Sequence, residues 1–362
     1  MCLGAAIQNR KQLVQRFFPA EIVLREFAEH AHALGKDDVL VKLAPIPMTP
    51  LFVGEVFFLV VGTVKKFINF NADLYGHELP AVIADCFGDV IVLQVLCLGM
   101  EAFKQDIVDA LVAEMHPQGI YERNDVPVRE LEGLEQHTGL LYGTVPDKVE
   151  MVENGVRFLV DVKEGQKTGF FLDQKENRAA IAPFVKDGRV LDCFTHTGSF
   201  ALHAGRYGAK EVIGVDISDF ACQCARENAR LNGLENTVRF ECANAFDYLR
   251  AAQENHEQFD VVILDPPAFT KTRSAVEGAL RGYKEINLRG MKLARDGGFL
   301  VTCSCSQHVL PHLFQSMVLD AQKDARVGLR QVEWRTQGRD HPILPAAPET
   351  QYLKCGIYQV FK

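Results

Sequence analysis

The sequence has 362 residues, of which 48% are hydrophobic and 24% are charged, and its formal net charge is −8 at pH 7. This length predicts about two or three domains with real hydrophobic cores. The negative charge excludes a protein that coats nucleic acid through a global positive field, but it leaves room for a local basic face.

The N-terminal residues carry no basic-then-apolar secretion signal, and the longest apolar run, 51–64, is interrupted by Glu55. That run is shorter than the roughly 20 apolar residues of a membrane-spanning helix. Ten cysteines are present without a CxxC pair or a histidine spacing that suits zinc. We therefore expect a cytoplasmic protein with reduced thiols, no membrane contact and no metal site.

The first 71 residues are the least regular part of the sequence. Residues 11–34 have a helical composition, and 39–43 and 51–61 look like strands on either side of a proline-rich stretch, 45–50. We treat residues 1–71 as a divergent N-terminal region and assign no function to it.

A small central α/β domain is expected over residues 72–144. A strand candidate, 90–96, follows the turn at 87–89, and a helix from about Glu101 to Met115 carries apolar residues at helical spacing. This pattern predicts a strand that packs against a helix.

A final domain is expected over residues 145–362, opening with a β-hairpin. Two β-rich runs, 148–152 and 156–162, flank the turn Glu153-Asn154-Gly155. An Asn-Gly pair between two such runs is a strong hairpin signal.

Strands and helices alternate from Asp187 onward. The expected strands are 189–194, 211–216, 237–242, 259–265 and 298–304, and the expected helices are 199–207, 219–232 and 283–294. Short apolar strands separated by helices predict a doubly wound, mostly parallel sheet of the Rossmann type. Its ligand is expected at the carboxyl ends of the strands.

The first of these strands contains Asp192 and leads through Phe194 and Thr197 to Gly198, where a helix begins. A bare backbone turn at a helix N-terminus can approach a ligand closely. Because the segment lacks the GxGxxG fingerprint of pyrophosphate binding, a dinucleotide is disfavoured. The alternative is a purely structural turn between strand and helix.

The second strand ends in Asp216, followed by Ile217, and an acid here can accept hydrogen bonds from both hydroxyls of a ribose. The third strand runs into Asn244 and Ala245. The Asn244 amide can recognise the amino edge of an adenine, with apolar neighbours on either side of the ring. The alternative for Asn244 is that of an ordinary turn former.

The fourth strand ends at Asp265 and Pro266, the start of an Asp-Pro-Pro loop. Acids after strands one and two, a polar residue after strand three and Asp-Pro-Pro after strand four together describe a site for S-adenosylmethionine. Upstream, we expect Phe171, Gln174 and Asn177 to close over the methionine end of this cofactor. The alternative is a solvated loop that precedes a helix.

Longer stretches of the sequence resemble a known family. The segments 166–178, Asp265-Pro-Pro-Ala-Phe269, Arg281-Gly-Tyr-Lys284 and Ser304-Cys-Ser306 are similar to the RlmI family of bacterial 23S ribosomal RNA 5-methylcytosine methyltransferases. The resemblance extends from about Ala72 to Lys362 and includes 85–89, 119–123, 340–342 and 348–354.

This resemblance implies an S-adenosylmethionine-dependent enzyme that acts on 23S ribosomal RNA. It also implies an N-terminal PUA domain, a central α/β domain and a C-terminal Rossmann-like methyltransferase domain. Residues 1–71 do not show the PUA pattern, because the Gly-rich opening and the His-Pro-Trp segment are absent and the only tryptophan is Trp334. That region is therefore truncated, divergent or replaced.

Cys305 is the expected nucleophile, since the resemblance aligns it with the cysteine of the family's Ser-Cys-Ser motif. Cytosine C5 is a poor nucleophile until a thiolate adds to C6, and Asp265 is expected to stabilise that adduct by hydrogen bonding to N3 and the amino group. Spacing alone does not separate Cys305 from Cys303, because side chains two residues apart on a strand face the same way. The alternative for either thiol is a buried core residue.

The target base must leave its stack to reach such a pocket. The residues expected to contact RNA are Pro267, Phe269, Lys271, Arg281 and Lys284, with Arg273 and Arg289 extending the same basic series. The alternatives are packing for Phe269, and for the basic residues a solvated helix face shared with Glu277 and Glu285.

Three other functions compete with cytosine methylation. One is methylation of a guanine nitrogen in ribosomal RNA, because Asp-Pro-Pro loops also bind exocyclic amines. A second is a non-catalytic RNA assembly factor that keeps its affinity for S-adenosylmethionine, and a nicotinamide dehydrogenase is a distant third. The sequence leaves open the target nucleotide, the choice between naked RNA and a ribosomal particle, and the oligomeric state, with a homodimer as one alternative.

Overall fold

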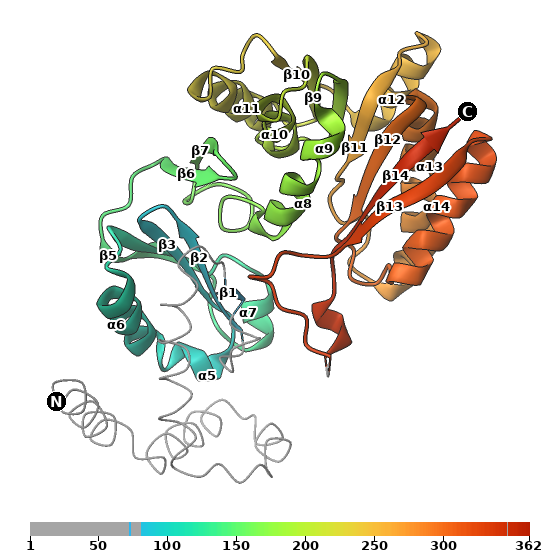
Figure 1. Ribbon diagram of the computed structural model, residues 1–362. Coiled ribbons are helices and arrows are strands. Elements are labelled where there is room, and N and C mark those ends of the chain that lie inside the picture. Colours follow the sequence, from blue (N-terminus) through green and yellow to red (C-terminus); the bar gives the residue numbers. More distant parts are fainter. Residues whose placement is uncertain (1–71, 74–80, 346) are drawn as a thin grey trace, which may run out of the picture. The chain divides into compact units, whose positions relative to one another are not determined.

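The computed structural model describes residues 72–73, 81–345 and 347–362. The chain divides into two compact units, with the boundary between Thr144 and Val145, and each unit is described by itself (Figure 1). The strands and the helix expected within residues 1–71, and the question of a PUA domain, lie outside the described residues.

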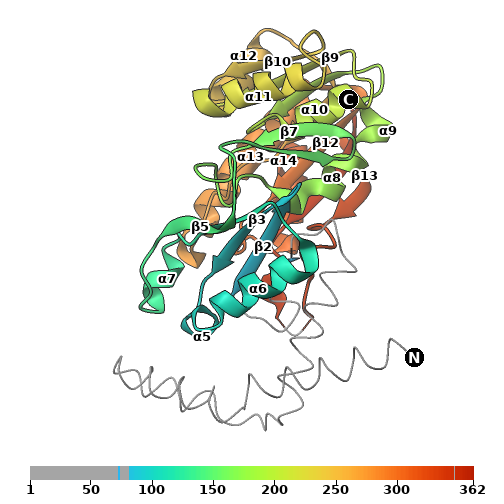
Figure 2. The ribbon, with the colours of Figure 1, turned by 90° about the vertical axis from the view of Figure 1, so that its left-hand side faces the viewer.

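The described part of the first unit is an α/β arrangement. Its strands are β1 (Ala72–Asp73), β2 (Val82–Phe87), β3 (Val90–Val95), β4 (Gly119–Arg123) and β5 (Thr138–Gly143), and its helices are α5 (Leu98–Glu101), α6 (Lys104–Met115) and α7 (Val128–Leu131). The five strands form one sheet in sequence order, in which only the pair β3 and β4 is parallel. Helix α6 packs on this sheet through Ile107, Val108 and Leu111 (Figure 2).

The expected strand at 90–96 is confirmed, whereas the expected helix is divided into two. A short turn, α5, ends at Glu101, and α6 begins at Lys104. The helix ends at Met115 because His116 adopts a left-handed conformation, with φ of 48°.

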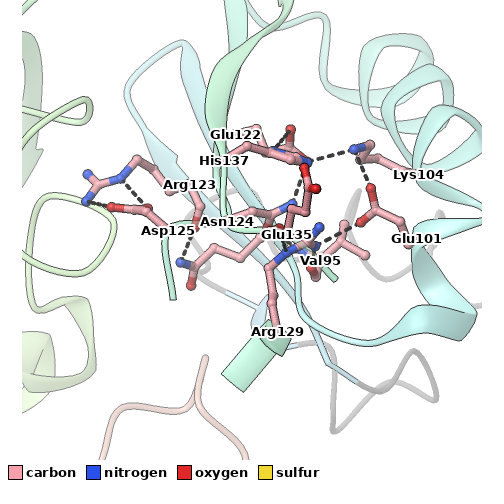
Figure 3. A network of polar contacts seen from close by, with 11 residues as sticks. Val95, Glu101, Lys104, Glu122, Arg123, Asn124, Asp125, Arg129, Glu135 and His137 are labelled. Carbon is pink, nitrogen blue, oxygen red and sulfur yellow. Dashed lines mark hydrogen bonds and ion pairs between the residues drawn. The ribbon is translucent and has the colours of Figure 1, made fainter. Parts of the chain in front are cut away.

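A polar network joins α5, α6, β3, β4 and α7 in this unit (Figure 3). The buried Arg129 guanidinium donates to Glu101 Oε2 at 2.9 Å and to the Glu135 carbonyl at 2.9 Å. Lys104 Nζ lies 2.6 Å from Glu101 Oε1 and 3.1 Å from Glu122 Oε1. Glu101, Glu122 and His137 are close enough to hold a metal ion. Two cations, Lys104 and Arg129, already pair with the two carboxylates, so we interpret the cluster as an ion-pair network.

The second unit contains a seven-stranded sheet in the order β10-β9-β8-β11-β12-β14-β13. The strands are β8 (Arg189–Cys193), β9 (Glu211–Asp216), β10 (Val238–Cys242), β11 (Phe259–Leu264), β12 (Ala294–Ser304), β13 (Gly328–Arg335) and β14 (Lys354–Phe361). The first five strands of this order are mutually parallel, and β14 runs antiparallel to β12 and β13. The predicted doubly wound, mostly parallel sheet is confirmed.

Helices cover both faces of this sheet (Figures 1 and 2). They are α8 (Lys175–Ala180), α9 (Ala182–Val185), α10 (Ser199–Arg206), α11 (Asp219–Leu231), α12 (Ala245–Glu254), α13 (Val276–Leu293) and α14 (Pro311–Ala325). Contacts group α9, α10 and α11 on one side and α12, α13 and α14 on the other. The chain order reverses between β8 and β11, so the ligand crevice of such a sheet is expected at their carboxyl ends.

Local sequence explains where several of these elements begin. Ser218 caps α11 by accepting a hydrogen bond from the Ala221 amide at 3.2 Å, and Asn244 caps α12 by accepting one from the Phe246 amide at 2.9 Å. Helix α13 begins at Val276, seven residues before the expected start at Tyr283. Helices α12 and α14 and strands β13 and β14 were not expected from the sequence.

The expected hairpin is confirmed as β6 (Val149–Glu153) and β7 (Val156–Val160). Asn154 and Gly155 have φ of 49° and 80°, as a two-residue hairpin turn requires. The hairpin is held on α11, where Asn228 Oδ1 accepts from the Leu159 amide at 2.9 Å and Asn232 Oδ1 from the Arg157 amide at 2.8 Å. Within the described ranges, no helix has the length and apolarity to span a bilayer.

Candidate active site

The loop between β8 and α10 has an unusual backbone. Phe194 and His196 have positive φ values of 66° and 51°, and Gly198 has 87°. Positive φ is uncommon for residues other than glycine and concentrates at functional sites. The loop is fixed by the Phe194 and Thr195 amides, which donate to the Val215 carbonyl at 2.8 and 3.0 Å.

Asp192 lies fully buried beneath this loop. Its Oδ2 accepts hydrogen bonds from the Thr195 hydroxyl at 2.5 Å and from the Ala201 amide at 2.9 Å. Its Oδ1 is buried and has no hydrogen-bond partner among the described residues. Burial raises the pKa of this carboxyl to about 8, so a cationic or hydrogen-bonding ligand group would relieve a real desolvation cost there.

Asp216 ends β9 at the same edge of the sheet. Its Oδ2 accepts from the His196 amide at 2.8 Å and its Oδ1 from the Ser218 amide at 3.0 Å. A carboxylate has about four acceptor positions, so each oxygen keeps capacity for a ligand hydroxyl. The neighbouring Ile217 is 70% exposed and offers apolar surface beside this carboxylate.

The third strand contributes less than expected. The Asn244 side-chain oxygen accepts the hydrogen bond that caps α12, so its orientation is fixed by the helix, and its amino group and one remaining lone pair are available to a ligand. Ala245 is buried in the core at the first turn of that helix. The geometry therefore supports the alternative interpretation of Asn244, in which this residue has a local structural role.

Gln174 and Asn177 hold protein groups in place. Gln174 Nε2 donates to Asp265 Oδ1 at 2.8 Å, and Asn177 Nδ2 donates to Gln174 Oε1 at 2.6 Å. Asn177 also donates to the Thr336 carbonyl at 3.1 Å and accepts from Arg335 Nε at 3.0 Å. These two amides thus connect the Asp-Pro-Pro loop with the segment after β13, rather than facing open space.

Phe171 precedes them and faces the β8–α10 loop. Its ring meets the His196 ring edge-on at 5.1 Å, and Lys167 Nζ lies 4.7 Å from its centroid. The structure therefore brings Phe171 and the loop of Phe194 to Gly198 together, as the sequence predicted for residues around a cofactor.

Arg178 is a charged residue that the sequence reasoning missed. It is completely buried, donates to both oxygens of Glu153 at 2.5 and 2.9 Å, and also donates to the Phe171 carbonyl at 2.8 Å. Its third nitrogen, Nη1, is buried without a partner among the described residues. In the sequence, Arg178 is simply the last residue of the segment 166–178. No periodicity there distinguishes a buried arginine from one on the surface.

Asp265 follows β11 and accepts the hydrogen bond from Gln174. Burial, and secondarily the charge of Asp173, raise the pKa of Asp265 to about 7. Near neutral pH this carboxyl is therefore present both as an acid and as a carboxylate. Pro266 is buried and Pro267 is exposed, so the loop turns outward directly after Asp265.

Cys305 comes directly after β12 and is partly exposed, with its Sγ 4.0 Å from the Pro266 carbonyl oxygen. Burial, and next the charge of Asp265, raise the pKa of its thiol to about 11. Cys303 is fully buried opposite Cys355 in the β12–β14 pair. The charge of Asp265 acts on both thiols, but Cys303 is fully buried whereas Cys305 is partly exposed and contacts the Pro266 carbonyl.

Tyr283 fixes the two serines that flank Cys305, a role that sequence reasoning did not assign. Its buried hydroxyl lies 3.0 Å from Ser304 Oγ, which donates to it, and 2.9 Å from Ser306 Oγ. The Thr270 amide also donates to Ser306 Oγ at 3.4 Å. The sequence feature that corresponds to this arrangement is the pair of serines, one on each side of Cys305.

The residues expected to contact RNA fall into two groups. Lys271, Arg273 and Arg281 are exposed. Lys284 Nζ lies 2.7 Å from Asp324 Oδ2, and Arg289 pairs with Glu285 at 2.7 Å, so part of the basic series is neutralised within the protein.

Phe269 belongs to an aromatic cluster. Its ring centroid lies 4.5 Å from that of Tyr283, 5.9 Å from that of Phe246 and 6.4 Å from that of Phe194. The packing alternative for Phe269 is therefore realised, and the ring remains half-buried next to the Asp-Pro-Pro loop.

The strand order, the antiparallel strand β14 and the acids at the ends of β8 and β9 define a Rossmann-like class I methyltransferase. The sequence model of the family described as "S-adenosylmethionine-dependent methyltransferase" matches residues 135–347. A ribosomal RNA large subunit methyltransferase I from Tolumonas auensis is 45% identical over 76% of this chain and 70% of its own length. The corresponding protein of Aeromonas salmonicida is 43% identical over the same shares. The chain therefore belongs to the family of ribosomal RNA large subunit methyltransferase I.

Solved structures agree on the fold. A putative S-adenosylmethionine-dependent methyltransferase from Streptococcus mutans superimposes with a TM-score of 0.72 over 87% of this chain and 82% of its own, at 20% identity. A putative methyltransferase complexed with SAH gives 0.73 over 87% and 83%, also at 20% identity. The family membership confirms S-adenosylmethionine as the cofactor and excludes the nicotinamide dehydrogenase.

Proposed function

We propose that this protein transfers a methyl group from S-adenosylmethionine to C5 of a cytosine in large-subunit (23S) ribosomal RNA. Its relatives are named ribosomal RNA large subunit methyltransferase I. The observation that carries the choice of atom is the position of Cys305, whose thiol lies beside the Pro266 carbonyl, one residue from Asp265. A thiol and a carboxyl at one strand edge are what methylation of a pyrimidine carbon needs, and methylation of an amine does not need the thiol.

The buried polar atoms without partners fit the cofactor. Asp192 Oδ1 is an acceptor suited to an amino group, and Arg178 Nη1 is a donor suited to a carboxylate. Asp216 keeps acceptor capacity for a ribose diol, and exposed Ile217 offers a surface for the adenine. The proposed cofactor site also includes Phe171, Phe194, Thr197, Gly198 and Pro266. Gln174, Asn177, Asn244 and Ala245 are proposed to support this site from behind, through their contacts with Asp265, with β13 and with the start of α12.

When bound, S-adenosylmethionine supplies an electrophilic methyl group on a sulfonium. Cys305, as the thiolate, forms a bond to C6 of the cytosine, and the C5–C6 double-bond electrons move to C5. After C5 has taken the methyl group, a base removes the C5 proton. The C6–S bond then breaks, and its electron pair returns to the thiolate.

Asp265 is proposed to hold the target base during this sequence. A neutral carboxyl can donate to N3, and its pKa of about 7 keeps a neutral fraction available near physiological pH. Donation to N3 draws electron density away from C6 and stabilises the adduct. The hydrogen bond from Gln174 fixes the carboxyl in position without adding a charge.

The base must be flipped out of its stack to reach Cys305. Pro267 and Phe269 line the proposed entrance, and the exposed Lys271 and Arg281 are proposed to contact phosphates. Lys284 is already paired with Asp324, so it is not part of this proposed contact. The same proposal places the reaction in the cytoplasm. The oligomeric state, including a homodimer, stays open.

The decisive experiment traps the adduct on ribosomal RNA in which 5-fluorocytosine replaces cytosine. Fluorine cannot leave C5 as a proton, so the enzyme should remain bound to RNA through Cys305 on a denaturing gel. Cys303→Ala is the matched control, because this thiol lies two residues away and is buried in the core. A trapped species with Cys303→Ala and none with Cys305→Ala supports the proposal. An enzyme that methylates ordinary RNA but never becomes trapped contradicts it.

The alternative of guanine N-methylation predicts a different outcome. An exocyclic or ring nitrogen has its own lone pair, so Cys305→Ala would only reduce that activity. Identification of the methylated base by mass spectrometry, with ribosomal RNA from a strain lacking the enzyme as substrate, separates the two. Absence of any transfer to that RNA would favour the non-catalytic assembly factor.

A further inference from the structure

Lys354 is a buried lysine at the first position of β14. Its side chain is 1% exposed, and its Nζ donates to the Ser306 carbonyl at 2.8 Å and to the Tyr352 carbonyl at 2.8 Å. Lysine is almost never fully buried unless a negative charge accompanies it, because the ammonium loses its hydration. The position of this charge therefore calls for a physical reason.

Among the described residues, no Asp or Glu forms an ion pair with Lys354. The single titratable side chain whose charge acts on the Lys354 ammonium is Cys305. Two backbone carbonyls satisfy hydrogen bonds but carry no net charge, and a neutral glutamine amide would satisfy them as well. The two carbonyls therefore account for a hydrogen-bond donor at position 354. They do not account for the positive charge of the lysine.

The sheet brings this ammonium to the thiol. In the antiparallel pair of β12 and β14, Lys354 lies opposite Ser304, the residue before Cys305. The carbonyl that accepts from Lys354 belongs to Ser306, the residue after Cys305. Lys354 is therefore anchored to the backbone on one side of the thiol and paired in register on the other.

Charges of both signs act on the Cys305 thiol. Asp265 has the largest effect and opposes its ionisation, Lys167 has the next largest and favours it, and the smaller effects are those of Asp173, which opposes ionisation, and Lys354, which favours it. Tyr283, which binds the flanking serines, stays neutral because burial raises its pKa to about 12. Of the two cations, the Lys167 side chain is 54% exposed and screened by water, whereas Lys354 is buried.

We propose that the Lys354 ammonium stabilises the thiolate of Cys305, so that Lys354 is a positioning residue for the nucleophile. This inference rests on the proposed function in taking Cys305 as the nucleophile. The thiolate would carry its negative charge in a partly buried pocket, where a neighbouring cation offsets the desolvation cost. Lys354 acts through Cys305 and needs no contact with the RNA base or the cofactor.

The test measures the thiol directly, as the rate at which iodoacetamide alkylates Cys305 at pH 7.5, followed by mass spectrometry of the peptide that contains it. Lys354→Gln keeps a donor for the two carbonyls without the charge, and Lys354→Met removes both. Lys323→Met is the matched control, because Lys323 is an exposed lysine of α14 that pairs with Asp320. The exposed Cys242 reports on general reactivity in every sample.

Both Lys354 variants should alkylate Cys305 about tenfold more slowly, the effect of one pKa unit, and Lys323→Met should match the native protein. A native rate in Lys354→Gln would overturn the proposal, because the residue would then serve only the carbonyls. This result would not affect the adduct-trapping experiment, which tests whether Cys305 is the nucleophile. Conversely, if trapping fails while the alkylation rates change as expected, Cys305 is not the nucleophile, but the effect of Lys354 on its thiol stands.

A second measurement needs no substitution at Lys354. In Asp265→Asn, which removes the nearest titrating acid, the alkylation rate should rise about tenfold per pH unit and then level off near pH 8, where Lys354 loses its proton because burial lowers its pKa to about 8. Above that pH each gain in thiolate is offset by loss of the ammonium. A rate that climbs without a break from pH 7 to 9.5 would overturn the proposal.

Discussion

Removal of the Arg178 guanidinium should destabilise the second unit strongly. In Arg178→Met, Glu153 loses two charge-assisted hydrogen bonds, of 2.5 and 2.9 Å, and remains almost completely buried, at 2% exposure. Burial is the main reason that the pKa of the nearby His203 is lowered to about 4, with the Arg178 charge as a smaller cause, so this imidazole replaces at most part of the lost charge. Breaking a buried pair by removing one partner costs about 3 to 5 kcal/mol, so we expect a loss of this size in the free energy of unfolding.

Urea unfolding followed by tryptophan fluorescence measures this loss specifically. Trp334 is the only tryptophan of the sequence and lies in β13, so its emission reports on the second unit alone. Urea is preferred because it carries no charge and does not screen ion pairs. The free energy is obtained by linear extrapolation, with unchanged slope as the check that the transition is the same.

The matched control is Arg157→Met, on the hairpin that also carries Glu153. Arg157 donates to both oxygens of Glu150 at 2.7 and 2.8 Å, in the same bidentate geometry, but the pair is exposed. Its loss should leave the unfolding midpoint nearly unchanged. Equal losses in the two variants, or a loss below about 1 kcal/mol in Arg178→Met, would refute the argument from burial.

The remaining predictions concern the two other acids at the strand ends. Asp216→Ala should weaken binding of S-adenosylmethionine by about 1 to 3 kcal/mol in calorimetry, because charged hydrogen bonds to the ribose are lost; an unchanged affinity would remove Asp216 from the site. Asp265 has a folded pKa of about 7, above its unfolded value of about 3.9, so its neutral form stabilises the fold below pH 4 and that stabilisation is lost as the pH rises to 7. Asp265→Asn should therefore flatten the decline of stability between pH 4 and 7, by up to about 1.4 kcal/mol per pH unit, and identical slopes in urea titrations would contradict this.

Local signals in the sequence were sufficient for much of the fold. The hairpin at Asn154-Gly155 is encoded by two residues that tolerate positive φ, and strands β9, β11 and β12 each contain a short apolar run. Strand β13 has no apolar run in the sequence because it lies at the sheet edge and half of its residues are exposed, among them Arg330 and Gln331. Helix α12 was missed because Asn244 was interpreted as a ligand residue, whereas it is the cap that starts this helix.

The site was predictable to the extent that it lies on consecutive strand ends. Asp192, Asp216 and Asp265 each follow or end a strand of the parallel sheet, and the sheet geometry alone brings them to one edge. Arg178 and Lys354 were not predictable, since their importance comes from burial beside charges that are distant in the chain. Sequence spacing carries no information on such pairings, and both residues read as ordinary surface cations.

The insertion of β14 between β12 and β13 also constrains the order in which the sheet can assemble. Among the described strands, β13 pairs only with β14, although β13 comes first in the chain. Strand β13 therefore joins the sheet only through β14. The pairing of β14 with β12 closes about fifty residues of chain, which include α14 and β13, and contacts of such high contact order form slowly. Since β14 carries Lys354, a folding intermediate that lacks this strand would display Cys305 without its cationic neighbour, and the thiol would acquire its final environment only once β14 has docked on β12.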